Sequence, residues 1–312
     1  ELVSHFKKKN YGLDFSVGVN AQYSIGGLDI SNNTFTNIID AIINTFVGGD
    51  IVINNNQFNN VNLFYSVDGY RCIDNNQDCA CDDLTDSSYG SYGYSCVNDD
   101  NFNIDFSSFG NYVQSYYTLP ASESNPMLTE TLAIAWFSNI NDAINVADEE
   151  TQVYLANGTY SGNILWPNKN IELIGAGIDS TIIEGDGLGR VITFSSPNID
   201  DESLIKNLTI TGGLGGILID GSSPTIDSCK ISNNITNGDV GGGIKIVGAG
   251  ATPVEPTIEN SIIINNKSIG NESISGGGAG IYISTGATPT IKKNLIALNE
   301  ATIGSAKGAG IM

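Results

Sequence analysis

The sequence predicts an all-β solenoid, because short phrases of the same kind return along residues 204–312. Pro-Thr-Ile occurs three times, at 224–226, 256–258 and 289–291, with spacings of 32 and 33 residues. An isoleucine follows seven residues after each proline and an asparagine ten residues after it, giving Ile231 and Asn234, Ile263 and Asn266, Ile296 and Asn299. Glycine before an apolar-x-apolar triplet recurs between the copies, at 216–219, 243–246 and 280–283. A supersecondary unit repeated at this spacing is the signature of a solenoid.

The repeats contain strands rather than helices. Their β-branched runs are bounded by Gly, Asn, Pro and Ser, which are strand and turn signals, and no helical pattern separates them. Strands that stack on their own copies one coil later form parallel sheets with an inward apolar row. We therefore expect a single parallel sheet to contain 153–155, 171–174, 191–194, 217–219, 244–246 and 281–283.

The recurring asparagines predict ladders at tight turns. A side-chain amide that bonds the same amide one coil away satisfies turn backbone that would otherwise be buried unpaired. Such a ladder is expected from Asn234 through Asn266 to Asn299. A second repeat, with an offset of 23 residues, aligns 30–38 with 53–61 and predicts a ladder of Asn33 and Asn56. An Asn-rich loop is the alternative for that segment, but the aligned pairs Phe35/Phe58 and Ile30/Ile53 favour the ladder.

Residues 138–147 form the clear helical pattern of the sequence, and short strand-like runs follow it. A short amphipathic helix, then a Gly-Thr-Tyr turn at 158–160, then an Ile-Gly strand ending at 175, resembles the opening of pectate-lyase-like domains. The resemblance implies a right-handed parallel β-helix with a short capping helix that covers its first coil. It implies little about function, because this fold serves lyases, hydrolases, adhesins and phage spikes.

Three regions are predicted along the chain: terminal coils of a β-helix at 1–65, a Cys/Tyr-rich connector at 66–126, and a second β-helix with its N-terminal capping helix at 127–312. The connector holds four of the five cysteines, Cys72, Cys79, Cys81 and Cys96. This even cluster predicts two disulfides and an oxidising compartment. A zinc site is the alternative, disfavoured by the close Cys79–Cys81 spacing.

The connector also contains an acidic loop with Asp74, Asp78, Asp82 and Asp83. Its oxygen-bearing side chains resemble a calcium loop in outline, so Ca²⁺ is the one cofactor to consider. The glycine and the final glutamate of an EF-hand are missing, and a solvated loop is the alternative. Among the Asn-x-Ser/Thr sequons, Asn271 is the glycosylation candidate, because glycans at Asn234 or Asn266 would break the ladder.

Composition excludes some functions. Thirteen Lys and Arg against 34 Asp and Glu give a net charge of −21, which disfavours nucleic-acid binding. No apolar run of about 18 residues is present to span a membrane. The single histidine, His5, lies at the start, and no catalytic residue is predicted. Arg190 near Glu184 and Asp186 is the one constellation suggestive of chemistry, and a surface arginine paired with a carboxylate is its simpler interpretation.

These observations favour an extracellular or cell-surface structural protein: a filament subunit or adhesin stalk that assembles head-to-tail. Its partners would be further copies of itself or cell-surface glycans. We expect the coil at 281–312 to abut residues 1–30 of the next unit, and a truncated fragment with free ends is the alternative. The other functions left open are a polysaccharide lyase or glycoside hydrolase, and a carbohydrate-binding β-helix without catalysis.

Overall fold

The computed structural model describes residues 17–22, 28–45, 51–70, 102–104, 106–119, 131–248, 250, 253–271, 277–302 and 308–312. The chain divides into two compact units, 1–148 and 149–312, and each is described by itself. The clustered cysteines and the acidic aspartates lie outside the described residues. The predicted disulfides and calcium site therefore gain no support and stay predictions.

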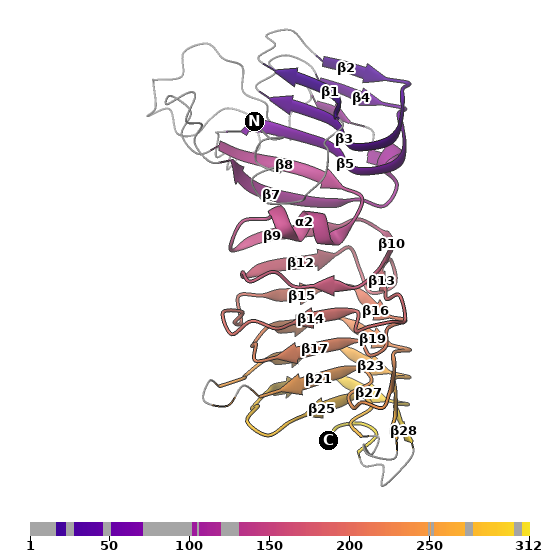
Figure 1. Cartoon of the computed structure of the whole chain (residues 1–312), viewed down its shortest axis with the longest axis vertical. Coiled ribbons are helices and arrows are strands. Elements are labelled where there is room, and N and C mark those ends of the chain that lie inside the picture. The colour runs from indigo at the N-terminus through magenta and orange to yellow at the C-terminus, as the bar shows by residue number, and fades with distance from the viewer. Residues whose placement is uncertain are drawn as a thin grey trace. The chain divides into compact units, whose positions relative to one another are not determined.

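The second unit is a stack of coils, each made of short strands separated by corners (Figure 1). The first three coils have three strands each: β9 (Thr151–Leu155), β10 (Gly158–Ser161) and β11 (Ile164–Leu165); β12 (Ile171–Gly175), β13 (Thr181–Glu184) and β14 (Ile192–Phe194); β15 (Leu204–Lys206), β16 (Thr209–Thr211) and β17 (Ile217–Asp220). The next two coils have four strands each: β18 (Thr225–Asp227), β19 (Lys230–Ser232), β20 (Ile235–Asn237) and β21 (Ile244–Val247); β22 (Thr257–Glu259), β23 (Ile262–Ile264), β24 (Lys267–Ile269) and β25 (Ile281–Ile283). The last described strands are β26 (Thr290–Lys292), β27 (Leu295–Ala297) and β28 (Glu300–Thr302).

Every strand of this unit pairs in parallel with the strand one coil away. Within the unit one sheet runs β9-β12-β15-β18-β22-β26, a second β10-β13-β16-β19-β23-β27, a third β11-β14-β17-β21-β25 and a short fourth β20-β24-β28. Alternate residues point inward, and an apolar core of stacked isoleucines fills the coils. Ile205, Ile226 and Ile258, for example, are fully buried on consecutive strands of the first sheet.

The prediction of a single sheet is wrong in one respect. Segments 153–155 and 171–174 belong to β9 and β12 of the first sheet, whereas 191–194, 217–219, 244–246 and 281–283 fall on β14, β17, β21 and β25 of the third. The Pro-Thr-Ile phrase continues the first sheet instead, as β18, β22 and β26. The length of a coil varies from 20 residues (Thr151 to Ile171) to 33 residues (Thr257 to Thr290). Because of this variation, the spacing of phrases in the sequence does not show which strands of the early coils stack on which strands of the late coils.

The first unit contains a second parallel stack. β1 (Val17–Gln22), β3 (Thr34–Thr45) and β5 (Gln57–Tyr70) form one parallel set, and β2 (Leu28–Ser31), β4 (Ile51–Asn54) and β6 (Phe102–Ile104) form another. The predicted register at an offset of 23 is confirmed, because Phe35 faces Phe58 with ring centroids 5.3 Å apart and nearly parallel planes. These rings belong to an aromatic cluster that includes Phe64 and Phe109.

The parallel stack of the first unit gives way to antiparallel pairing. β8 (Thr131–Phe137) pairs antiparallel with β5 and with β7 (Val113–Leu119), and a short 3₁₀ turn, η1 (Phe106–Phe109), contacts β5. The predicted helix is present as α2 (Ile140–Val146) and packs on β7 and β8. Asn139 caps it by accepting the N–H of Asp142 at 2.9 Å. Its role in covering a coil of the second β-helix stays a prediction.

Candidate functional site

The predicted asparagine ladder of the second unit is continuous from coil to coil. The main-chain N–H and the Nδ2 of Asn234 donate to Oδ1 of Asn266 at 3.1 and 3.0 Å. The same two groups of Asn266 donate to Oδ1 of Asn299 at 3.0 and 3.1 Å. Asn234 and Asn266 are completely buried, so these bonds replace water for groups that have no access to it.

The side-chain amides of the ladder also donate hydrogen bonds to main-chain carbonyls of the preceding coil. Nδ2 of Asn266 donates to the carbonyl of Ile231 at 2.9 Å, and Nδ2 of Asn299 donates to the carbonyl of Ile263 at 2.8 Å. The ladder has a direction, because donors on one coil always meet the Oδ1 of the next coil along the chain. At its start, Oδ1 of Asn234 accepts the N–H of Gly213 at 3.0 Å.

The residue before each ladder asparagine has a left-handed backbone. Asn233, Asn265 and Leu298 have φ angles of 58°, 56° and 56°. Asparagine tolerates this conformation better than other non-glycine residues, because its short polar side chain bonds locally. Leu298 is therefore an exception, and it is also 77 % exposed.

The first unit contains the same corner, and the predicted ladder of Asn33 and Asn56 is confirmed there. Asn33 donates its N–H and Nδ2 to Oδ1 of Asn56 at 3.0 and 3.3 Å, so the ladder runs in the same direction. The preceding residues, Asn32 and Asn55, have φ angles of 61° and 52°. The shared phrase Ile-Ser-Asn-Asn, at 30–33 and 231–234, was the signal that could have identified it.

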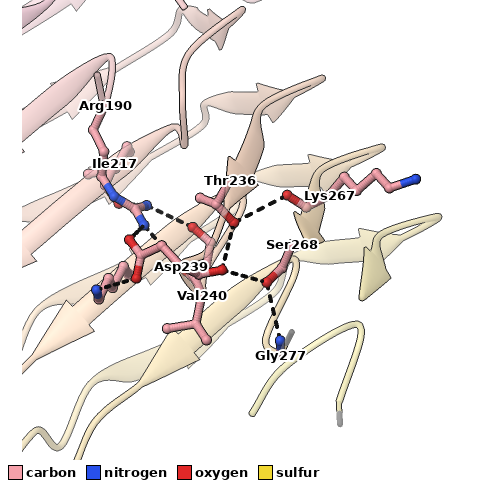
Figure 2. A network of polar contacts seen from close by, with 10 residues as sticks. Arg190, Ile217, Thr236, Asp239, Val240, Lys267, Ser268 and Gly277 are labelled. Carbon is pink, nitrogen blue, oxygen red and sulfur yellow. Dashed lines mark hydrogen bonds and ion pairs between the residues drawn. The ribbon is translucent and has the colours of Figure 1, made fainter. Parts of the chain in front are cut away.

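Arg190 is the centre of a second polar network (Figure 2). Its Nη2 forms an ion pair with Oδ2 of Asp239 at 2.9 Å and donates to the carbonyl of Val240 at 2.8 Å. Its Nη1 donates to the carbonyls of Gly241 at 2.7 Å and Ile217 at 3.3 Å. The guanidinium therefore closes the turn between β20 and β21 onto β17, the strand one coil earlier.

The rest of this network also fastens the turn. Oδ1 of Asp239 accepts from Nζ of Lys245 at 2.6 Å. The carbonyl of Asp239 accepts from the hydroxyls of Thr236 and Ser268, each at 3.0 Å (Figure 2). Burial raises the pKa of Asp239, but hydrogen bonds from Lys245 and Arg190 outweigh it and hold that pKa below its ordinary value. A carboxylate held ionised between two cations has no tendency to act as a general acid or base near neutral pH.

The arginine pocket depends on glycine at one position. A Cβ at Gly215 would lie 2.7 Å from Nη1 of Arg190, and Gly215 has a φ of 95°. The expected surface arginine beside Glu184 and Asp186 is not what the structure shows. Arg190 is 8 % exposed and pairs with Asp239, whereas Asp186 accepts from Nδ2 of Asn163 at 2.6 Å. The guanidinium thus acts as a structural clamp.

A comparison with protein families identifies this arrangement. The family described as "Right handed beta helix region" matches residues 151–312, slightly more than half of the chain. The chain belongs to the right-handed β-helix family. No curated protein and no solved structure matched it in parallel comparisons. The expected resemblance to a right-handed parallel β-helix is thereby confirmed for the second unit.

The remaining site residues of this β-helix protein are structural in character. The N–H of Cys229 donates to Oγ of Ser261 at 3.0 Å, and the N–H of Ser261 donates to Oδ1 of Asn294 at 2.8 Å, forming a second column of small polar residues. Cys229 is a free thiol, and burial raises its pKa to about 12, which makes it a poor nucleophile.

The sequence also predicted a glycosylation site at Asn271, and the structure shows how accessible the sequon asparagines are. Asn271 is exposed, whereas the sequon residues Asn234 and Asn266 are inaccessible in the folded β-helix. Within the residues that the structure describes, no three His, Cys, Asp or Glu side chains are grouped to hold a metal ion. Over the same residues, no helix has both the length and the apolar character needed to cross a bilayer.

Proposed function

We propose that this β-helix protein is structural: an extracellular or cell-surface rod, acting as a filament subunit or adhesin stalk, whose coils stack longitudinally. The observation that carries the proposal is the continuous stack of parallel strands in the second unit, in which each strand pairs with the strand one coil away. Each coil of such a stack contacts only its neighbours, so the stack extends in one dimension.

The interior of the stack supports the same proposal. Ile205, Ile226 and Ile258 are completely buried on consecutive strands of one sheet. Each coil therefore keeps its apolar residues from water by packing against neighbouring coils, and stacking supplies the stability of the rod.

The polar side chains at the corners support a structural role rather than catalysis. The ladder asparagines and Arg190 have their hydrogen-bonding groups directed at neighbouring coils. The net charge of −21 suits an exposed, soluble surface, and the clustered cysteines suit an oxidising compartment. Cell-surface glycans are the partner class that an adhesin stalk would meet.

Two measurements test this function. Electron microscopy of the protein in its native setting should show fibres or surface arrays. Incubation with pectin, alginate and related acidic glycans should release neither unsaturated nor reducing ends. Sustained release of such ends would instead identify a polysaccharide lyase or a glycoside hydrolase, and glycan retention without cleavage would identify a carbohydrate-binding β-helix.

A further inference from the structure

We propose that the corner after the second sheet of the second unit is an interface between two copies of this chain, which pair side by side with their coil axes antiparallel. The inference goes beyond the proposed longitudinal stacking and does not depend on it, because the residues that carry it lie in internal coils. An exposed apolar column supplies the contact, and opposite charges at its two ends set the orientation.

Three large apolar side chains, which we call the apolar column, are exposed on this corner: Leu188, Leu214 and Ile235. They lie in consecutive coils. The N–H of Leu214 donates to the carbonyl of Gly189, beside Leu188, at 2.8 Å. The N–H of Ile235 donates to the carbonyl of Gly213, beside Leu214, at 3.1 Å. The column is therefore a contiguous apolar surface, and contiguous exposed apolar side chains mark interaction sites more often than scattered ones do.

Glycines surround the two leucines of the column. The phrase Gly-Leu-Gly occurs at 187–189 and again at 213–215. Because glycine has no side chain, a partner surface can approach the backbone on both sides of each leucine as well as the leucine itself. The corner thus presents its apolar side chains without neighbouring side chains that would hold a partner away.

The end of the column at Leu188 is acidic. Glu184 and Asp186 are both exposed there, and Oδ1 of Asp186 accepts the N–H of Leu188 at 2.8 Å. Neither carboxylate forms an ion pair with any residue that the structure describes. Two negative charges without a cation therefore lie beside an exposed apolar side chain.

The end of the column at Ile235 is basic. Lys267 occupies the position that Ile235 fills one coil earlier, on the paired strands β20 and β24. Its ammonium group points away from the Arg190 network and forms an ion pair with Glu300 at 3.2 Å (Figure 2). The side chain of Lys267 is 34 % exposed, so a further carboxylate can reach it.

The order of these groups is self-complementary when the two copies run in opposite directions. A two-fold axis between Leu214 and Ile235 places each of these residues against the other one in the second copy. The same axis places Lys267 of one copy against Glu184 and Asp186 of the other. Copies that ran in the same direction would bring carboxylates to carboxylates and ammonium to ammonium, which disfavours that arrangement. The apolar column supplies the affinity, and the charges select the antiparallel orientation.

A zero-length carbodiimide cross-link tests this orientation. Within one chain Lys267 lies three coils from Glu184 and Asp186, which separates their strands by roughly 14 Å. A bond from Lys267 to either carboxylate can therefore form only between copies. A mixture of isotope-labelled and unlabelled chains should give this cross-linked peptide with one half from each, as mass spectrometry detects. The bond from Lys267 to Glu300 within one chain is the positive control for the reaction.

Substitutions in the column test the apolar contact. Leu214→Ser removes its centre, and sedimentation equilibrium should show dimerisation weakened by about tenfold or more. Leu165→Ser is the matched control, because Leu165 is also exposed but lies on the outer face of the third sheet. It should leave dimerisation unchanged. Circular dichroism establishes that each variant folds.

Substitutions at the charged ends test the orientation even if Leu214→Ser fails to fold. Lys267→Glu places a third carboxylate against Glu184 and Asp186 of the other copy and should abolish dimers. Adding Glu184→Lys to that variant should restore part of the association. The control is Lys206→Glu, which changes the net charge equally. Lys206 is 39 % exposed and forms a similar ion pair, with Asp227 at 3.0 Å, on the first sheet.

Three outcomes would overturn the inference: a chain that stays monomeric at every concentration, dimers that lack the cross-link from Lys267 to Glu184 or Asp186, or a loss of association with Lys267→Glu no larger than with Lys206→Glu. The glycan-release assay is independent of all three. Glycan cleavage would refute the structural role, and the cross-link would still report whether two copies pair at this corner.

Discussion

At the scale of single residues, Leu298 departs from the rule that the corners otherwise follow. It occupies the left-handed position that Asn233 and Asn265 fill in the preceding coils, with φ at 56°. A left-handed conformation costs a residue with a Cβ about 1–2 kcal/mol, and asparagine recovers part of this. Leu298→Asn should therefore raise the free energy of unfolding by about 1 kcal/mol.

Urea denaturation of the monomeric protein measures that gain. Leu295→Asn is the control, because Leu295 is also exposed but lies in a strand without a positive φ. It should give no gain. Equal stabilisation by both substitutions would mean that the loss of exposed apolar surface, rather than the backbone, is responsible.

The ladder asparagines make the second residue-level prediction. Asn266→Ala would leave the N–H of Asn234 and the carbonyl of Ile231 buried without their side-chain partners. An unsatisfied buried group costs about 1–3 kcal/mol, so the free energy of unfolding should fall by at least that amount. Asn237→Ala, at an exposed position of β20, should change it little. Similar losses for both would show that the ladder has no special weight.

At the scale of elements, the contribution of each inward isoleucine to the free energy of unfolding should depend on the position of its coil in the stack. Ile263→Ala empties a fully buried position between two coils and should cost about 2–5 kcal/mol of unfolding free energy. Ile296→Ala removes the same atoms from the partly covered position of β27 and should cost less in the monomer. Chemical denaturation of the two variants at low concentration compares them directly. A larger loss for Ile296→Ala would contradict the assignment of β27 to an open edge.

The clamp on the turn between β20 and β21 should make stability depend on pH. The pKa of Asp239 in the folded state lies below its ordinary value of 3.8, so its contribution is fully present above that value. It is lost as the pH falls through the lower, folded-state pKa. The difference in melting temperature between the unmodified chain and Asp239→Asn should thus be constant from about pH 7 to pH 5 and shrink below about pH 4. A difference that grows on acidification would refute the ion pair with Arg190.

The sequence predicted the parts of these elements that depend on short-range repetition. The helix, the parallel strands and the two ladders follow from spacings within one or two repeats. The partner of Arg190 does not, because Asp239 lies 49 residues later and reaches it only through the coil lengths between them. The sheet assignment failed for the same reason: a coil of 20 residues and a coil of 33 place equivalent phrases on different sheets.

At the scale of the whole molecule, the same corner recurs in both units, and the sequence shows it as the repeated phrase Ile-Ser-Asn-Asn. The left-handed backbone angles that establish the corner are seen only in the structure. The two copies differ in offset, 23 residues in one unit and 32 or 33 in the other. The connector is different in kind. Its cysteines and aspartates belong to no repeat, so the sequence offers no spacing from which to predict their geometry, and the disulfides and the calcium site stay predictions.

Net charge should control how strongly copies of the molecule associate. Stacking brings chains that each carry −21 charges within the distances of neighbouring coils, so long-range repulsion opposes every junction. The two ion pairs of the last coil, Lys267–Glu300 and Lys292–Glu259, lie within one chain and do not cancel that repulsion across a junction. Salt shortens the screening length from roughly 30 Å at 0.01 M to about 3 Å at 1 M.

Raising NaCl from about 0.02 M to about 0.5 M should therefore increase the mean mass of the assembled chain. Salt screens the electrostatic repulsion between copies, whereas it leaves the short-ranged apolar contacts between stacked coils unchanged. Light scattering at fixed protein concentration measures the increase. Ile296→Asp provides the control, because it places a charge at a partly covered inward position of β27, where a stacked coil would bury it. Its scattering should not respond to salt if salt acts only by allowing coils of two copies to stack. Calcium chloride at matched ionic strength separates screening from a specific ion, because an effect beyond that of NaCl would point to the acidic loop at 74–83. A mean mass that falls as NaCl rises would show that attraction between opposite charges, rather than stacked coils, holds the copies together.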